Sequence, residues 1–133
     1  MGNFFLFDQQ CEGAMKLEIL SVKGRGDHTQ ESVRLKVIDD CDLKHYMVAD
    51  TTYTGDTTIS NRVRHTHWFK PGAVKQGDFV WLYTGPGKNT TRGNDSGSTT
   101  HVRYWGLNKA VWNDEGDCAL LFQIATWRGK RVQ

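Results

Sequence analysis

Ser32-Val33-Arg34-Leu35-Lys36-Val37 is the stretch that decides the fold, because apolar and polar side chains alternate through it without a break. Successive side chains of a β-strand point to opposite faces of the sheet. Val33, Leu35 and Val37 therefore share one face, and the polar side chains share the other. This pattern predicts a half-buried strand with one face on a core and the other in water.

The same two-residue period continues on both sides of this strand, and no segment shows helical periodicity over three turns. Turn residues separate about eight short apolar segments, which is typical of a β-sandwich or barrel. The predicted strands are Met15–Val22, Ser32–Val37, Leu43–Ala49, Val63–Phe69, Phe79–Thr84, Val102–Trp105, Val111–Trp112, Cys118–Ile124 and a short last strand ending at Gln133. Residues 50–61 and 88–100 are rich in small polar residues and are predicted to be loops, the second long and mobile.

The length of 133 residues suits one domain, which we place at residues 15–133. Residues 1–14 stand apart as an N-terminal extension that contains the apolar run Phe4–Phe7. This run is either an upstream addition or an extra strand that pairs with an edge of this chain or of a second copy, which would make a dimer.

The cysteines and the N-terminus indicate the compartment. Cys11, Cys41 and Cys118 are irregularly spaced and form no Cys-x-x-Cys pair, which favours three free thiols over one disulfide and a free thiol. No signal-peptide core and no membrane span is visible. The sequence thus predicts a soluble, cytoplasmic protein, or a secreted or periplasmic one if a leader has been removed.

Charge is distributed unevenly along the chain, although the formal net charge is only +2. Residues 57–113 carry eight Lys/Arg against two Asp/Glu, a net charge of +6. Cations among aromatic residues suit an acidic partner, which could be a protein, another acidic polymer or a nucleic acid. The candidate binding residues are Arg62, Arg64, His65, His67, Lys88, Arg92, His101 and Arg103. A second hypothesis is carbohydrate recognition through exposed Trp68, Trp81 or Trp105, although such aromatic residues more often fill a core.

A metal-dependent enzyme is the third hypothesis, because His65 and His67 stand two residues apart on one predicted strand, with His101 as a further ligand. The residues after His67 lack the glutamate that a cupin-type site would supply. Asp39, Asp40 and Asp42 resemble a cation-binding corner but match no calcium-loop spacing. No nucleophile motif or phosphate-binding loop is present. We therefore expect no catalytic residue, no metal and no cofactor.

Four segments, in order, resemble the lamin tail domain family. Glu31–Leu35 is similar to the family's "EYVEL" strand, and Asp42–Asp50 to its "dLsGW.L.D" strand. Pro71–Gly87 is similar to "Pxg..L..G..V.vytG.g", and Val111–Leu121 to "vWnn.GD...L". Two departures occur in the second segment, where His45 replaces the usual Gly and Tyr46 the usual Trp.

The resemblance covers residues 15–133 and implies an immunoglobulin-like β-sandwich in which Trp112 fills the core. It also implies a non-catalytic interaction module, which binds proteins or DNA in lamins and accompanies extracellular or membrane-associated enzymes in bacteria. The matching motif residues are structural, and the family supplies no catalytic residue. These structural residues are Tyr46, Gly77, Gly85, Trp112, Asn113, Gly116 and Asp117.

Overall fold

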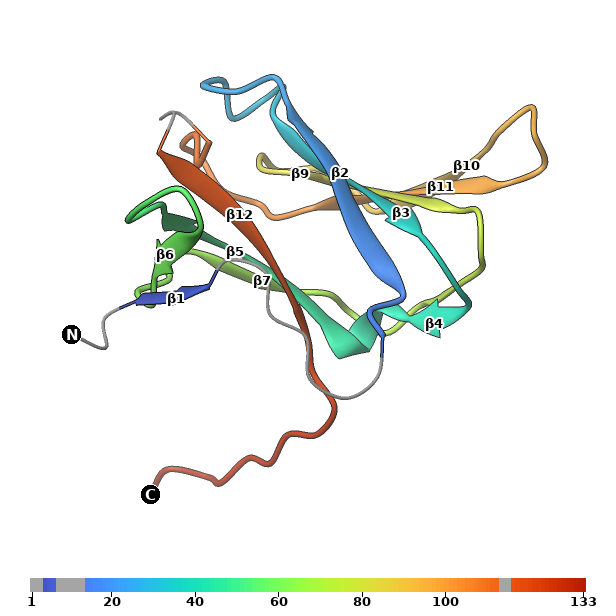
Figure 1. Ribbon diagram of the computed structural model, residues 1–133. Coiled ribbons are helices and arrows are strands. Elements are labelled where there is room, and N and C mark those ends of the chain that lie inside the picture. Colours follow the sequence, from blue (N-terminus) through green and yellow to red (C-terminus); the bar gives the residue numbers. More distant parts are fainter. Residues whose placement is uncertain (1–3, 7–13, 113–115) are drawn as a thin grey trace.

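The computed structural model describes residues 4–6, 14–112 and 116–133 (Figure 1). Nearly all of its regular structure is β-strand, with one short 3-10 turn, η1, at Leu43–His45. The strands are β1 Phe4–Leu6, β2 Leu17–Lys23, β3 Ser32–Val37, β4 Cys41–Asp42, β5 Tyr46–Thr52, β6 Thr58–Ser60, β7 Thr66–Trp68, β8 Ala73–Val74, β9 Phe79–Tyr83, β10 Thr90–Gly93, β11 Thr99–Tyr104 and β12 Asp117–Gln123.

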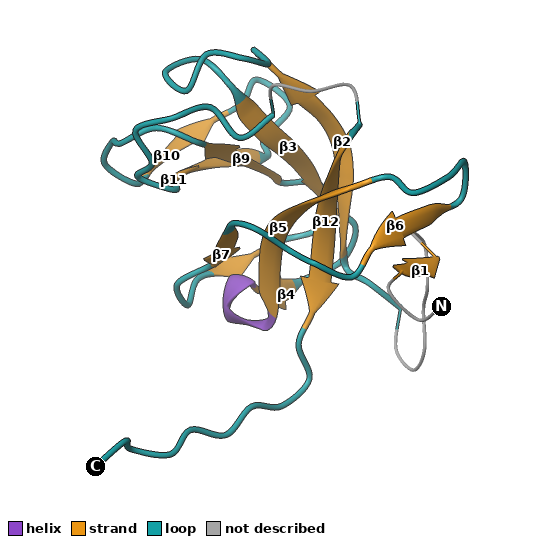
Figure 2. Cartoon of the chain, turned by 90° about the vertical axis from the view of Figure 1, so that its left-hand side faces the viewer, coloured by secondary structure: helices purple, strands orange, loops and turns teal. Residues whose placement is uncertain are grey.

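Two sheets form the body of the domain, one above the other in Figure 2. The larger has the strand order β10-β11-β9-β3-β2, and the smaller has the order β12-β5-β7. Two small sheets, β1-β6 and β4-β8, lie beside them. The predicted all-β sandwich is therefore confirmed.

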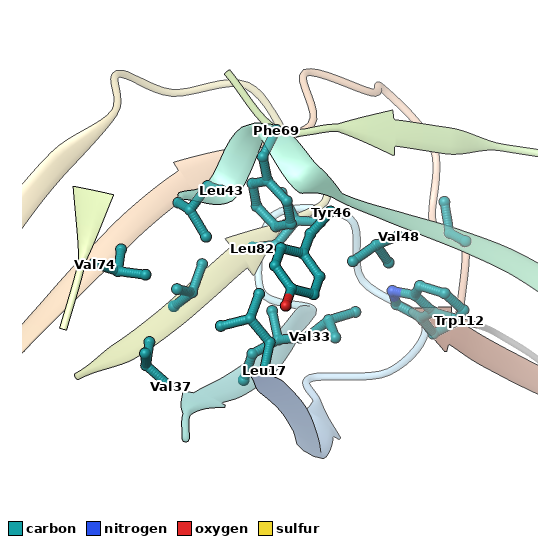
Figure 3. Close-up of a cluster of buried hydrophobic side chains, with 13 residues drawn as sticks. Leu17, Val33, Val37, Leu43, Tyr46, Val48, Phe69, Val74, Leu82 and Trp112 are labelled. Atoms are coloured by element: carbon teal, nitrogen blue, oxygen red, sulfur yellow. The ribbon is translucent and has the colours of Figure 1, made fainter. Parts of the chain in front are cut away.

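Alternating apolar side chains from both sheets meet in one core (Figure 3). Tyr46 is almost completely buried within it. The Tyr46 hydroxyl donates to Gln123 Oε1 at 2.9 Å and accepts from the backbone N–H of Lys16 at 3.0 Å. The core thus contains an aromatic ring whose hydroxyl has two hydrogen-bond partners. The buried core residues are Leu17, Val33, Leu35, Val37, Leu43, Tyr46, Val48, Phe69, Val74, Val80, Leu82, Val111 and Trp112.

Several predicted element bounds were wrong. Residues 88–100 do not form one long loop, because β10 pairs with β11 through a tight turn in which Asn94 Nδ2 donates to the side chains of Ser98 and Thr100. Residues 50–61 contain the end of β5 and all of β6. The predicted strand at residues 63–69 shortens to β7, and residues 124–133 contain no strand.

The most consequential feature of the topology is the parallel pairing of β9 with β11. The chain leaves β9 at Tyr83, passes through residues 84–89, and runs back as β10 at the sheet edge. β11 then returns between β10 and β9. Residues 84–89 must therefore cross over the end of β11 to reach the sheet edge.

Trp112 is 2% exposed, as predicted, but residues 111–112 form no strand. Their backbone is held instead by Glu31, whose side chain is fully buried at the start of β3. Glu31 Oε1 accepts from the N–H groups of Val111 at 2.6 Å and Trp112 at 3.4 Å. Glu31 Oε2 accepts from the N–H of Gly26 at 3.2 Å. The Glu31 carboxylate thus accepts backbone hydrogen bonds that a neighbouring strand would accept if the Trp112 segment lay in a sheet.

The other predicted structural residues that the structure describes lie in turns or at the ends of strands. Gly77 has a φ of +91°, a conformation that favours glycine. A Cβ on Gly85 would lie 2.7 Å from the backbone oxygen of His28, so the chain approaches too closely there for a side chain. Gly116 and Asp117 lead into β12, whereas Asn113 lies outside the described residues.

The N-terminal segment supplies one extra strand, since β1 pairs antiparallel with β6 of the same chain. Cys41 and Cys118 are free thiols, and Cys11 lies outside the described residues. The described part of the chain holds no helix of the length and apolarity needed to cross a bilayer.

We predict that Glu31→Gln destabilises the fold by about 1–3 kcal/mol, because an amide NH2 cannot accept the N–H bonds that one carboxylate oxygen now accepts. Urea unfolding would measure the change. Glu18→Gln, on an exposed position of β2, is the matched control. A loss no larger than that of the control would contradict a structural role for the Glu31 carboxylate.

Candidate binding site

A pocket of about 460 Å³ lies where the two sheets open toward solvent. One wall comes from β7 and the residues after it, and the other from residues 87–89 and the end of β11. Three of the lining side chains are cations and none is a carboxylate. We call this site the mouth pocket; its lining residues are His67, Lys70, Gly87, Lys88, Asn89, Arg103 and Tyr104.

The crossing of residues 84–89 over β11 shapes the mouth pocket. Gly87 lies against the Tyr104 ring so closely that a Cβ on this glycine would collide with it. Asn89 Oδ1 accepts from the backbone N–H of Tyr104 at 3.2 Å, which fixes the loop to the end of β11. Lys88 lies between these two contacts, so the fold holds its backbone in place although its side chain is exposed.

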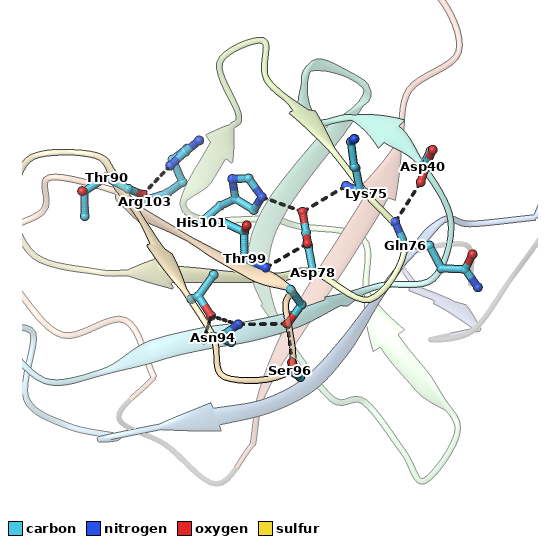
Figure 4. A network of polar contacts seen from close by, with 12 residues as sticks. Asp40, Lys75, Gln76, Asp78, Thr90, Asn94, Ser96, Thr99, His101 and Arg103 are labelled. Atoms are coloured by element: carbon cyan, nitrogen blue, oxygen red, sulfur yellow. Dashed lines mark hydrogen bonds and ion pairs between the residues drawn. The ribbon is translucent and has the colours of Figure 1, made fainter.

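Arg103 is the half-buried cation of the mouth pocket. Its Nη1 donates to the backbone oxygen of Thr90 at 3.1 Å (Figure 4) and to that of Val102 at 2.9 Å. Burial lowers the pKa of the Arg103 guanidinium. No carboxylate of the described residues forms an ion pair with it. A partly desolvated charge without a counterion is costly, and an anion in the pocket would offset this cost.

His67 forms the apolar side of the mouth pocket. Its ring lies 5.0 Å from the centroid of Phe69 and 5.9 Å from that of Trp105. Burial, with a smaller effect from Lys70, lowers the pKa of His67 to about 4. His67 is therefore neutral at pH 7, and the positive charge of the mouth pocket comes from its lysine and arginine side chains.

Seven of the eight predicted binding residues separate into three groups. His67, Lys88 and Arg103 meet in the mouth pocket. Arg92 lies on β10 with its guanidinium 4.7 Å from the Trp81 ring centroid. The exposed residues Arg62, Arg64 and His65 precede β7, outside the pocket lining; Arg64 lies 4.0 Å from Asp117, and His65 Nδ1 lies 3.1 Å from Asp50 Oδ1.

His101 is the clearest departure from the predicted surface, because it is buried inside the large sheet. Its Nε2 lies 2.9 Å from Asp78 Oδ2, which also accepts from the N–H of Lys75 (Figure 4). Asp78 Oδ1 accepts from the N–H of Thr99 at 3.0 Å. His101 pairs in register with Val80 and so points toward the core. The pair therefore ties β11 to the turn before β9.

Sequence reasoning did not assign Lys70, Asn89 or Tyr104 to the site. Lys70 belonged to the basic stretch and follows β7 directly, which was the available signal. Asn89 and Tyr104 meet only because β11 lies between β9 and β10. No pattern in the sequence reveals that strand order.

The metal hypothesis gains no support from the described residues, which contain no group of three His, Cys, Asp or Glu side chains placed to hold an ion. Asp42 Oδ1 accepts from the N–H groups of Lys44 and Gly72, and Asp40 Oδ1 accepts from that of Gln76. Asp39 Oδ1 accepts from the N–H of Asp40, so all three residues of the predicted acidic corner use their carboxylates to bind backbone N–H groups.

The three tryptophans proposed for sugar binding lie in different settings. Trp68 is 45% exposed and meets Trp127 edge to face, with ring centroids 4.9 Å apart. Trp105 donates to the backbone oxygen of Thr66 and contacts the Trp112 ring. Trp81 is covered by the guanidinium of Arg34 at 4.0 Å and by that of Arg92. The three indoles do not form one shared stacking surface.

A scan against models of known protein families found no match, and a search of curated proteins found none either.

We predict that Asp78→Asn lowers stability at pH 7 by about 1–3 kcal/mol, because an amide cannot accept all the bonds that Asp78 now accepts. Burial alone would raise the pKa of Asp78, but hydrogen bonds from His101, Thr99 and Lys75 outweigh it and lower this pKa. The carboxylate therefore stabilises the fold above the unfolded-state pKa of about 3.8. This contribution disappears as the pH falls through the folded-state pKa.

Thermal unfolding at a series of pH values would test this. The difference in melting temperature between the native protein and Asp78→Asn should be largest near neutral pH. It should become smaller below the unfolded-state pKa of Asp78. Asp95→Asn, in the exposed turn before β11, is the matched control. A difference in melting temperature that stays constant down to strongly acidic pH would contradict the role of the Asp78 charge.

Proposed function

We propose that this chain is a non-catalytic binding module of the lamin-tail type that binds an acidic partner at the mouth pocket. The observation that carries the proposal is the half-buried guanidinium of Arg103, which has no ion-pair partner among the described residues and lines the same pocket as Lys70 and Lys88. Buried charges in folded proteins are normally paired. An anionic group of the partner would supply the missing counterion.

The shape and fixation of the site also support binding. Its volume lies within the range of about 300–1,000 Å³ that ligand pockets span. Two backbone carbonyls hold Arg103, and Asn89 holds the loop to β11. A cation that is already oriented loses less side-chain entropy when it binds an anion. The position of Lys70 and Lys88 on opposite walls would let an anion contact both.

Inorganic tripolyphosphate tests the proposal, since it is a compact polyanion without rings. Titration calorimetry at low salt should show binding that weakens as salt rises, because screening reduces the attraction between exposed charges. Lys88→Gln and Arg103→Gln should each weaken it about tenfold. The control Arg62→Gln/Arg64→Gln removes two cations that lie outside the pocket lining and should change affinity less than twofold.

A second measurement reports the location of binding. An anion in the mouth pocket favours the protonated form of His67, so bound tripolyphosphate should raise the pKa of this histidine above about 4. Proton NMR of the imidazole would follow the shift. Binding that leaves the His67 pKa unchanged, or that Arg103→Gln does not weaken, would overturn the proposed site.

A further inference from the structure

The mouth pocket continues onto the outer face of the large sheet through two stacked rings. Tyr104 lines the pocket and stacks on Tyr83, with ring centroids 5.5 Å apart and an interplanar angle of 22°. The two residues are partners in the register of β9 and β11. The stacked pair therefore connects the cationic pocket to the solvent face of the sheet.

On that face, β9 presents three aromatic side chains in a row. Val80 and Leu82 point into the core, so Phe79, Trp81 and Tyr83 point away from it, and each is half-buried. The row spans about 13 Å, at ~3.3 Å per residue. Figure 2 shows the large sheet as the upper layer, with no other strand or helix of the described chain above it. We call Phe79, Trp81, Tyr83 and Tyr104 the aromatic row.

Cations lie along both sides of the aromatic row. Lys36 and Arg34 on β3 are the register partners of Phe79 and Trp81. From the other side, Arg92 on β10 reaches the Trp81 ring. No ion pair of the described residues uses these three side chains. Glu18 at the β2 edge is the one carboxylate within the five strands of the sheet.

We propose that the acidic partner is a single-stranded nucleic acid, with one phosphate in the mouth pocket and the following bases along the aromatic row. This inference rests on the proposed function and specifies its ligand. A single strand offers both chemistries that the surface displays, because its phosphates pair with cations and its bases stack on aromatic rings or guanidinium planes. The row and the pocket together have room for a site of roughly four nucleotides, the lower end of the range for single-strand-binding domains.

The other acidic partners fit this surface less well. An acidic protein segment would engage the cations but has no flat rings to use the aromatic row. A double helix keeps its bases stacked inside and presents phosphates along its outside, so it would bring no base to the stacked pair of Tyr83 and Tyr104. Stacked tyrosine rings and guanidinium planes next to a cationic pocket therefore favour an unpaired strand.

Fluorescence anisotropy with a labelled short oligothymidylate tests the inference. We expect binding at low salt that weakens steeply as salt rises. Tyr83→Leu keeps apolar bulk but removes the ring, and it should weaken oligothymidylate binding about fivefold or more. The double variant Arg34→Gln/Arg92→Gln should also weaken oligothymidylate binding about fivefold or more. Neither variant should change tripolyphosphate binding, whereas Lys88→Gln should weaken binding of both ligands.

Three controls separate this inference from the proposed function. Arg62→Gln/Arg64→Gln should leave oligothymidylate binding unchanged, and circular dichroism would confirm that Tyr83→Leu is folded. Arg92→Gln alone, at an exposed position, provides a second test that does not disturb the core. A polyglutamate peptide and a duplex of equal length serve as competitors, and both should compete poorly.

The outcomes are distinct. If tripolyphosphate binds but oligothymidylate binding is not weakened by Tyr83→Leu and Arg92→Gln, the single-strand inference is overturned. The proposal that the mouth pocket binds an anion is then retained. Equal competition by the duplex or by polyglutamate overturns it as well. If neither tripolyphosphate nor oligothymidylate binds, the inference and the proposed function fail together.

Discussion

The position of Trp112 in the core depends on one buried carboxylate. The Trp112 segment belongs to no sheet, so its backbone N–H groups have no ladder to bind. Glu31 accepts two of them, and it also accepts the N–H of Gly26 in the turn that precedes β3. A buried carboxylate is tolerated where several N–H groups surround it, since these hydrogen bonds offset the cost of its desolvation. The packing of the Trp112 indole in the core therefore depends on the hydrogen bonds that Glu31 accepts.

The candidate site follows from a different constraint, the place of β11 between β9 and β10. This strand order requires residues 84–89 to cross the end of β11 and brings Lys88 and Asn89 next to Arg103 and Tyr104. The same order places Tyr104 beside Tyr83, which joins the pocket to the outer sheet face. The grouping of the cations, the mouth pocket and the stacked tyrosine rings thus all follow from the position of β11 between β9 and β10.

The sequence predicted two strands of the large sheet closely. β3 has the predicted bounds, and β9 differs by one residue, because alternation of apolar side chains is a local signal. β10 was missed because all four of its residues are exposed, so burial left no pattern. Of the site, the cations were visible in the charge distribution. The grouping of these cations in one pocket could not be predicted from the sequence. It depends on strand order and register, as do the burial of His101 and the approach of Asn89 to Tyr104.

The tight contact between Gly87 and the Tyr104 ring limits how this site can diversify. A side chain at position 87 would force the loop away from β11, so the backbone around the mouth pocket has little freedom to change shape. Positions 70 and 88 carry exposed side chains that form no ion pair with the described residues, and each can be exchanged without moving that backbone. Related chains could then acquire different partners by replacing these two side chains on a fixed frame.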